Sequence, residues 1–539
     1  MKPFAMAALL LGAAAPLAAQ GRRAAQDAEG ANVQRAVATI TEDDYRQRIG
    51  VIADDSMRGR GTPSPELDQV AAWIAAQFQS FGLRPGGDNG TFFQRYPIRR
   101  TQLDTTSFVM AMGRGAHGHW VLGKEAATGF RAALAEGDGN GLLALMVGTP
   151  TDTVNPFAGA SVAGAVILQV APALTGRGPG GGGGGGAPMA AVLRRAREAG
   201  VVAWISLTPQ PGDVFRLALN RSLEPAVTLM QDGPPPAPGV PVFTVRDSSA
   251  ADLLRAAGED IAALRGQTTF SVRLLPGFSG AFHIHFRTDQ QVTAPNVIGV
   301  LEGSDPVLKN EYLFFTGHMD HVGVAGMGNG CTAVGADSIC NGADDDASGT
   351  TGVVMLAQAF SRMRPRPRRT LVFMTVSGEE RGLWGSQWYA THPLLPLAST
   401  VADLNMDMIG RYFDNRIGWR DTIAVIGKEH SSLGAVANRV TQEHPDLHMS
   451  LVDDIWPGQR FYFRSDHYNF ARRGVPILFF FNGTHPDYHR VSDSVDKIDA
   501  EKASRIVKMV FYVGLEVANA TERPQWNPES RRQIVDTGN

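Results

Sequence analysis

The second half of the chain alternates short apolar runs with helical patterns, and this alternation is what most limits the fold. The apolar runs occupy residues 296–301, 311–316, 369–376, 401–407 and 475–481. A helical pattern at residues 353–360 follows the second run. Alternation of this kind predicts a mostly parallel or mixed sheet flanked by helices. In such an α/β fold, ligands bind beyond the carboxyl ends of the strands.

Histidines and carboxylates, the usual metal-ligating groups, stand where these runs end. They come from separate places in the chain: His318, Asp320, Asp345, Glu379, Glu380, Asp407 and His489. Acidic residues at one strand end are common, but several such clusters in one domain indicate a shared site. For Glu379 and Glu380 considered alone, a solvated loop pair is the alternative.

The types of these residues favour a catalytic metal pair over a structural metal site. Histidine and carboxylate ligands without thiolates are typical of catalytic zinc. The carboxylates of Asp345, Glu380 and Asp407, together with a bridging hydroxide, would balance the charge of two Zn²⁺ ions. His318 and His489 would add neutral nitrogen ligands. The sequence therefore predicts a two-metal hydrolase.

Five motifs carry a family resemblance. In chain order they are Gly-His-Met-Asp, Asn-Gly-Ala-Asp-Asp-Asp-Ala-Ser-Gly, Ser-Gly-Glu-Glu, Asn-Met-Asp-Met-Ile-Gly and Tyr-His-Arg-Val-Ser-Asp-Ser. They resemble the di-zinc aminopeptidases of the aminopeptidase Y and bacterial leucyl aminopeptidase type, to which glutamate carboxypeptidase II is more distantly related. The resemblance covers residues 290–510 and implies the zinc exopeptidase (phosphorylase/hydrolase-like) fold and release of N-terminal residues from peptides.

The resemblance also implies a role for each ligand. His318, Asp345 and Asp407 would bind one zinc ion. Asp345, Glu380 and His489 would bind the other, so that Asp345 bridges the two ions. This choice takes the middle aspartate of the three at positions 344–346.

Two further residues would carry the chemistry that the resemblance implies. Glu379 would act as the general base that takes a proton from a metal-bridged water. Tyr488 would donate a hydrogen bond to the developing oxyanion, with core packing as the alternative. Asp320 would hold the His318 ring from behind.

Several other polar side chains are expected outside the ligand set. Asp466 and Asp493 are candidates for supporting roles around the ligands. We expect His321, His467 and His485 on the surface or behind the ligands. Trp384, Trp388 and Trp456 could line a substrate pocket, but packing is the ordinary role of a tryptophan.

Residues 126–275 differ in character and predict an inserted domain. Short apolar runs at 142–147, 164–170 and 201–207 read as strands, and residues 189–199 as a helix. We expect a mostly-β domain, similar in position to the protease-associated domain of the same family. The peptidase domain would then be discontinuous, over 38–125 and 276–525, with 526–539 as a C-terminal tail. The glycine run at 180–186 predicts a loop.

Two histidines near the end of this region stand two positions apart. Residues 282–286 alternate apolar and polar side chains, so His283 and His285 share one face of a strand. Such a pair can bind a metal ion. A solvated polar face is the commoner interpretation and is the one we expect.

The N-terminus predicts export. Lys2, the apolar residues 4–11 and the small residues that follow form the pattern of a signal peptide over residues 1–20, with a buried helix as the alternative. The protein would therefore be secreted or periplasmic. Cys331 and Cys340 would then form a disulfide, a reduced pair being the alternative.

Composition excludes some partners and leaves several activities open. The formal charge of −3 over 539 residues gives no reason to expect nucleic acid or an anionic membrane as a partner. No later stretch of the sequence is long and apolar enough to span a membrane. A carboxypeptidase or dipeptidase is the main alternative. A one-zinc glutaminyl cyclase-like enzyme is disfavoured by Asp345 and Glu379, and a metal-free binding module by the complete ligand set.

Overall fold

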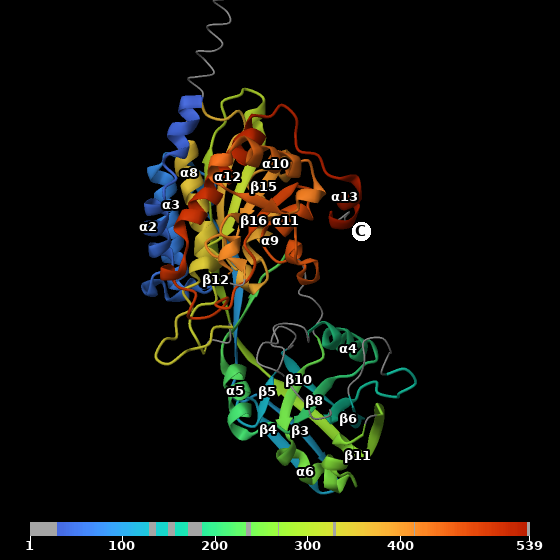
Figure 1. Ribbon diagram of the computed structural model, residues 1–539. Coiled ribbons are helices and arrows are strands. Elements are labelled where there is room, and N and C mark those ends of the chain that lie inside the picture. The colour runs from blue at the N-terminus through green and yellow to red at the C-terminus, as the bar shows by residue number, and fades with distance from the viewer. Residues whose placement is uncertain are drawn as a thin grey trace, which may run out of the picture. The chain divides into compact units, whose positions relative to one another are not determined.

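The computed structural model describes residues 30–128, 136–148, 157–170, 186–232, 239–267, 269–326, 330–413 and 416–535. The predicted signal peptide and residues 180–185 of the glycine run lie outside these residues, whereas Gly186 begins a helix. The chain forms two compact units, one from residues 1–96 and 293–539 and the other from residues 97–292 (Figure 1). The chain passes between the units within β2 (Phe93–Leu103) and β12 (Phe286–Leu301).

The first unit is built on a mixed sheet, as the alternation of runs predicts. Its strands follow the order β17-β16-β18-β15-β13-β14-β12. They are β12, β13 (Tyr312–His318), β14 (Thr370–Val376), β15 (Thr400–Met406), β16 (Thr422–Ile426), β17 (Ser450–Val452) and β18 (Ile477–Phe481). Strands β14, β13, β15 and β18 run parallel, so their carboxyl ends share one edge. Strand β12 is antiparallel to β14, β16 is antiparallel to β18 but parallel to β17, and the short β1 (Arg84–Pro85) pairs with β12.

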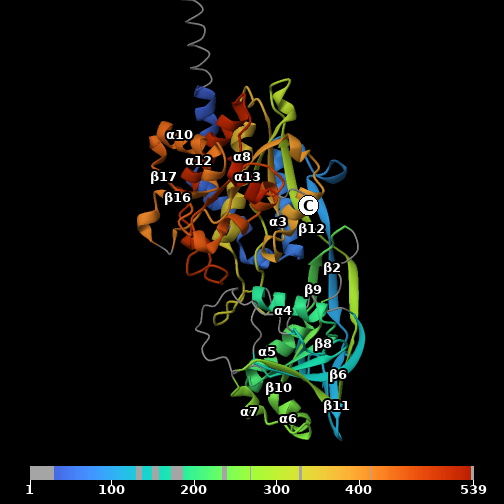
Figure 2. The ribbon, with the colours of Figure 1, turned by 90° about the vertical axis from the view of Figure 1, so that its right-hand side faces the viewer.

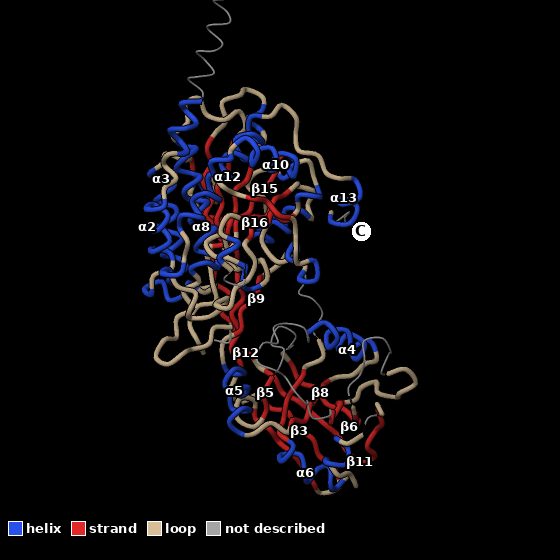
Figure 3. Tube along the Cα trace, in the orientation of Figure 1, coloured by secondary structure: helices blue, strands red, loops and turns tan. Residues whose placement is uncertain are grey.

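Helices cover this sheet. They include α2 (Glu42–Ile52), α3 (Pro65–Ser80), α8 (Gly349–Ser361), α9 (Trp384–Thr391), α10 (Leu433–Glu443), α11 (His467–Ala471) and α12 (Ala500–Asn519). Helix α12 packs on α2, α8 and α10, and α9 packs on α11. Figures 1 and 2 show α8 beside α12, and Figure 3 shows the strands between helices.

Local sequence explains where the first helices begin and end. Thr41 accepts a hydrogen bond from the backbone N–H of Asp44 and caps α2. Ser64 caps α3 in the same way, and Pro65 occupies its first turn. Gly82 follows α3 with φ +77°, where a glycine is expected.

The central strands are buried on both faces. Every residue of β14 and β15 is buried, and Phe315 and Phe373 stack with ring centroids 5.2 Å apart. Continuous apolar strands are what a sheet covered by helices requires. This core fixes the edge at which the strand ends meet.

The second unit contains an eight-stranded sheet in the order β4-β3-β11-β6-β7-β8-β10-β5. The strands are β3 (Phe108–Gly113), β4 (Ala116–Val121), β5 (Ala126–Thr128), β6 (Gly137–Val147), β7 (Val166–Val170), β8 (Ala203–Thr208), β10 (Val242–Arg246) and β11 (Ser271–Ile284), and β9 (Ala226–Leu229) pairs with β2. The helices are α4 (Gly186–Glu198), α5 (Gly212–Leu223), α6 (Asp247–Ala256) and α7 (Ile261–Arg265).

The boundaries of this unit differ from the predicted insertion at 126–275. Strands β3 and β4 lie before residue 126, and β11 extends beyond residue 275. They belong to the same unit because β11 pairs with both β3 and β6. The strands at these boundaries find their hydrogen-bonding partners only in the folded sheet, so the sequence alone does not show where the domain begins and ends. The predicted relationship of this unit to the protease-associated domain stays a prediction.

Residues 526–535 are not a free tail, which corrects the expectation for 526–539. The indole N–H of Trp526 donates to the backbone carbonyl of Gly474 at 2.8 Å. Asn527 then caps α13 (Pro528–Ile534), and Ile534 is buried in the core of the first unit.

Two further expectations can be compared with the structure. Cys331 and Cys340 are joined by a disulfide. Within the described part of the chain, no helix is both long enough and apolar enough to cross a bilayer.

Candidate metal centre

The predicted ligands meet at the carboxyl edge of the parallel strands. His318 is the last residue of β13, and Asp407 follows β15 directly. Glu380 lies in the loop after β14, and Asp345 lies just before α8. His489 comes from the loop after β18 and is the most exposed of the five, at 29% of its side chain. Parallel strands that end at one edge bring these distant residues together.

The five side chains form two groups that share Asp345. The His318 Nε2 atom lies 3.3 Å from Asp345 Oδ1 and 3.6 Å from Asp407 Oδ1. The His489 Nε2 atom lies 3.1 Å from Asp345 Oδ2 and 3.1 Å from Glu380 Oε2. Ligand bonds of about 2.0–2.1 Å in a tetrahedral site place neighbouring donor atoms about 3.3 Å apart. One oxygen of Asp345 therefore faces each group, as a bridging carboxylate would.

The neighbours of Asp345 are held by the backbone and point elsewhere. Asp344 Oδ1 accepts from the N–H of Gly410 at 2.6 Å. Asp346 Oδ1 accepts from the N–H of Gly349 at 2.7 Å. Because backbone groups engage both flanking carboxylates, Asp345 is the one of the three that lies between His318 and His489.

His321 joins the second group, although its sequence position suggested the surface or a supporting place. It is buried, and its Nδ1 atom lies 2.8 Å from Glu380 Oε1 and 3.8 Å from Asp345 Oδ2. Gly342 permits this approach, because a Cβ there would lie 2.4 Å from the His321 ring. The surface interpretation was wrong. The available signal was the spacing of His321, three residues after His318 at the end of one strand.

The buried polar atoms of this centre fit divalent cations. Asp345 Oδ2, Glu380 Oε1, Asp407 Oδ1 and His489 Nε2 make no hydrogen bond within the described part of the chain. Buried polar atoms without partners are costly, and a cation bound between them removes that cost. Nitrogen and carboxylate donors in this arrangement suit zinc.

Electrostatics points the same way. Burial raises the pKa of Glu379 well above its ordinary value; His318 opposes this, whereas Glu380 and other nearby carboxylates add to it. Burial also raises the pKa of Asp407. For His489, burial lowers the pKa, but the nearby carboxylates of Asp345 and Glu380 outweigh it and raise the pKa to about 10. The centre thus concentrates negative charge that cations would neutralise.

The loop that carries Glu379 is fixed by short contacts. Gly378 has φ +75°, and a Cβ there would lie 2.6 Å from the Tyr96 hydroxyl, so the turn requires glycine. The Glu379 N–H donates to Asp320 Oδ1 at 3.3 Å, and the Thr62 hydroxyl donates to Asp320 Oδ2 at 2.7 Å. Asp320 Oδ1 is also 3.7 Å from His318 Nδ1. Asp320 therefore positions the Glu379 loop and lies behind the His318 ring.

Arg60 is a positioning residue that the sequence did not reveal. Its buried guanidinium donates to the carbonyls of Met319 at 2.8 Å and Gly342 at 2.6 Å. It also donates to the carbonyls of Asn341 and, at 3.2 Å, Asp345. One side chain thereby joins the segment that holds His318 to the loop that holds Asp345. Its sequence context, a glycine-containing loop, gave no sign of this.

The remaining supporting candidates divide into those that touch the ligands and those that do not. Asp493 accepts from the backbone N–H of Asp345 at 3.1 Å, and the Ser465 hydroxyl donates to Asp407 Oδ2 at 2.8 Å. Asp466 instead accepts from the Ser386 hydroxyl at 2.5 Å.

The two other histidines also lie away from the metal groups. His467 Nε2 is 2.9 Å from the carbonyl of Tyr462, and His485 Nε2 is 3.2 Å from Asp344 Oδ2. Both are buried, so neither is a surface residue.

A small pocket opens onto the centre. Its lining consists of His318, Asp345, Glu379, Asp407, Met408, Phe461, Arg464, Ser465, Phe479, Phe481, Thr484 and Tyr488. Trp384, Trp388 and Trp456 are not among these residues. The aromatic wall therefore comes from phenylalanines and Tyr488. The polar lining residues that are not metal-ligand candidates are Glu379, Arg464, Ser465, Thr484 and Tyr488.

Tyr488 keeps its proton in this cavity. Burial raises the pKa of its hydroxyl well above the ordinary value, and Asp345, Glu380 and Glu379 raise it further. Its ring lies 3.8 Å from that of His489, centroid to centroid. The hydroxyl can therefore donate a hydrogen bond near the metal groups.

Parts of this chain are similar in sequence to known proteins. Residues 296–514 match the model of peptidase family M28. A probable zinc metalloprotease of Pyricularia oryzae is 28% identical over 236 residues, which are 36% of this chain and 45% of that protein. A probable zinc metalloprotease of Pyrenophora tritici-repentis is 31% identical over 135 residues, 25% of each chain. The chain thus spans about half the length, or less, of these curated relatives.

Among solved structures, an aminopeptidase from Aneurinibacillus sp. strain AM-1 resembles the whole chain. The match has a TM-score of 0.54 at 18% identity and covers 91% of this chain and 97% of that one. At this identity the likeness concerns the fold. It agrees with the mixed α/β architecture described above.

Proposed function

We propose that the protein, of which residues 296–514 match the model of peptidase family M28, is an exported zinc aminopeptidase that releases N-terminal residues from peptides. The observation that carries the proposal is the pair of ligand groups that share the Asp345 carboxylate. The names of the fungal relatives and of the Aneurinibacillus structure support zinc and aminopeptidase activity. Export rests on the signal pattern at residues 1–20.

Two zinc ions fit the donor set. His318, Asp345 and Asp407 would hold one, and Asp345, Glu380 and His489 the other, with His321 beside Glu380. When bound, the ions would polarise the scissile carbonyl and lower the pKa of water at the site.

Glu379 would move the proton during hydrolysis. Its carboxylate takes a proton as water attacks the carbonyl carbon, and returns it to the amine as the C–N bond breaks. The protonated Tyr488 hydroxyl would donate to the carbonyl oxygen as it gains charge.

The test combines metal content with turnover. The purified protein should hold two zinc ions and cleave aminoacyl-anilides. Glu379→Gln should keep both ions and lose about 10²–10⁴-fold in kcat, whereas the matched variant Glu380→Gln should lose metal. Metal content near zero, or full activity in Glu379→Gln, would refute the proposed site.

Arg464 favours one alternative, a carboxypeptidase or dipeptidase on the same scaffold. Its guanidinium lies 4.7 Å from the Phe461 ring centroid and lines the cavity. The only carboxylates among the described lining residues are Asp345, Glu379 and Asp407. A guanidinium binds a carboxylate through two parallel hydrogen bonds, so a free C-terminus would fit here.

A panel of substrates separates the two activities. Cleavage of free dipeptides and aminoacyl-anilides, but not of N-blocked dipeptides, supports the aminopeptidase. Cleavage of N-blocked dipeptides, with a tenfold or larger rise of KM in Arg464→Met, supports the carboxypeptidase. Arg460→Met is the control, because Arg460 stacks on Phe463 and is not a lining residue.

A further inference from the structure

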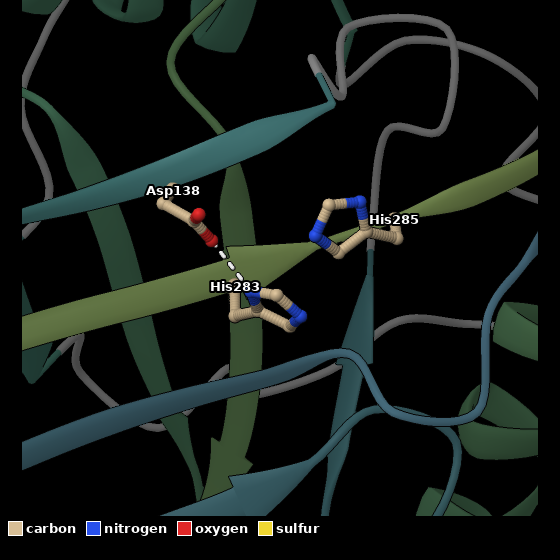
Figure 4. Close-up of side chains that lie close together, drawn as sticks. All are labelled: Asp138, His283 and His285. Carbon is tan, nitrogen blue, oxygen red and sulfur yellow. Dashed lines mark hydrogen bonds and ion pairs between the residues drawn. The ribbon is translucent and has the colours of Figure 1, made fainter.

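Two histidines of the second unit face two carboxylates across neighbouring strands. His283 Nδ1 lies 2.5 Å from Asp138 Oδ1, and His285 Nδ1 lies 3.3 Å from Glu136 Oε1. The two imidazole rings are 4.2 Å apart, centroid to centroid. Figure 4 shows Asp138, His283 and His285 close together on one side of the sheet. None of these four residues belongs to the metal centre of the first unit.

Strand register explains the juxtaposition. In the antiparallel pairing of β6 and β11, His283 is opposite Asp138, and Ile284 is opposite Gly137. Alternate residues of a strand point to the same face, so His283 and His285 share the face of Asp138. Glu136, one residue before β6, continues that face opposite His285. Two successive cross-strand pairs thus bring two imidazoles and two carboxylates together on one face.

The side chains of Asp138, His283 and His285 lie closer to one another than two separate ion pairs require. Asp138, His283 and His285 each offer one ligand atom, and these three atoms all lie within 4.8 Å of one another. Phe108 stacks on the His283 ring at 5.4 Å and limits its rotation. An ion pair needs only one imidazole nitrogen per carboxylate and no approach between the two histidines. A shared ion accounts for all three contacts.

We propose that Asp138, His283 and His285, with Glu136 beside them, form a second metal site that takes a divalent transition-metal ion such as Zn²⁺ or Cu²⁺. Two imidazoles and a carboxylate are the donors that these ions prefer, whereas Ca²⁺ and Mg²⁺ prefer all-oxygen sites. The donors are partly exposed, with 32% of the His283 side chain and 41% of the His285 side chain accessible. The ion would exchange with solvent and tie the start of β6 to the end of β11.

The chain offers a matched control on β4. His117 and His119 have the same two-residue spacing and are exposed, but their cross-strand partners are Met112 and Met110. A double variant there removes two exposed histidines that are not proposed donors; of the two, His119 contacts Phe108, the residue that also stacks on His283.

The experiment measures metal bound by the full chain after chelator treatment. Equilibrium dialysis against Zn²⁺ gives the total bound, and Cu²⁺ titration followed by electron paramagnetic resonance reports nitrogen ligation. His283→Ala/His285→Ala should bind one ion fewer than wild type and lose one Cu²⁺ signal. His117→Ala/His119→Ala should match wild type, and both variants should keep peptidase activity.

A milder variant guards against loss of fold. Asp138→Asn keeps the size and hydrogen bond of the side chain but removes its charge, and should weaken binding at this site at least tenfold. Unchanged stoichiometry and signal in the histidine variant would overturn the proposal. Equal losses in the two histidine variants, or unchanged affinity in Asp138→Asn, would overturn it too. Because activity is read separately, failure here leaves the proposed peptidase function untouched.

Discussion

Replacing Arg60 with methionine should destabilise the first unit and loosen its metal centre together. The guanidinium is fully buried and donates to four backbone carbonyls, those of Met319, Asn341, Gly342 and Asp345. Methionine fills much of the same volume but donates nothing. The four carbonyls would then lose a charged partner inside the protein.

The magnitude follows from these contacts. A buried acceptor left without its partner costs about 1–3 kcal/mol, and loss of one partner of a buried charged network costs about 3–5 kcal/mol. Entry of water and relaxation of the loop recover part of the sum, so we expect about 4 kcal/mol. Unfolding entropy of about 2.1 cal/mol/K per residue over the first unit, about 340 residues, converts this to a fall in Tm of about 5–6 °C.

Calorimetry in the presence of chelator measures this loss without the contribution of bound metal. Arg46→Met is the matched control, because Arg46 pairs with Glu42 on the surface of α2 with half of its side chain exposed. Such exposed pairs contribute little, so the control should shift Tm by less than about 1 °C. A second measurement, zinc affinity, should fall about 10–100-fold in Arg60→Met because the Asp345 loop loses its anchor.

Two outcomes would refute this reasoning. If Arg60→Met unfolds within 1 °C of wild type, the four contacts do not stabilise the fold. If stability falls but zinc affinity does not, Arg60 supports the unit without positioning the ligands.

Two other perturbations have defined outcomes. Burial lowers the pKa of Lys502 to about 7, so between about pH 7 and 10 the unfolded chain binds a proton that the folded chain does not, and this group makes stability rise with pH. The deficit of Lys502→Met relative to wild type, measured by urea unfolding, should therefore grow from pH 7 to pH 9.5, and a constant deficit would contradict the shift. Removing the Cys331–Cys340 disulfide with two serines should cost about 2–3 kcal/mol, since the closed loop spans nine positions. Reductant should lower the Tm of wild type but not of the double variant, and equal responses would show that the bridge does not contribute.

Much of the first unit was predictable because the information is local. The runs that became β13, β14 and β18 are mostly apolar, which identifies buried strands without knowledge of their partners, whereas β15 also carries Asp403 and Asn405. Parallel strands must end at one edge, so the histidines and carboxylates after these runs could be expected near one another. The caps of Thr41 and Ser64 accept hydrogen bonds from residues three positions later, so they too depend on local sequence.

The parts that escaped prediction depend on contacts between distant residues. Arg60 reaches carbonyls more than 250 positions away, and nothing near it in sequence marks a buried cation. His321 was assigned to the surface or to a place behind the ligands, because its direction depends on how the loop at Gly342 passes its ring. The boundary of the second unit moved outward because β11 pairs with strands on both sides of the predicted insertion.

The two histidines of β11 show the division most clearly. Strand periodicity alone determined that His283 and His285 share a face, and it favoured a solvated one. Only the register between β6 and β11 decided that Asp138 lies beside His283 on that face, because strand pairing is set by the packing of the whole sheet. In the same way, residue chemistry determined which side chains could hold metal in the first unit. The fold decided that Asp345 stands between them, since the backbone engages both of its neighbours.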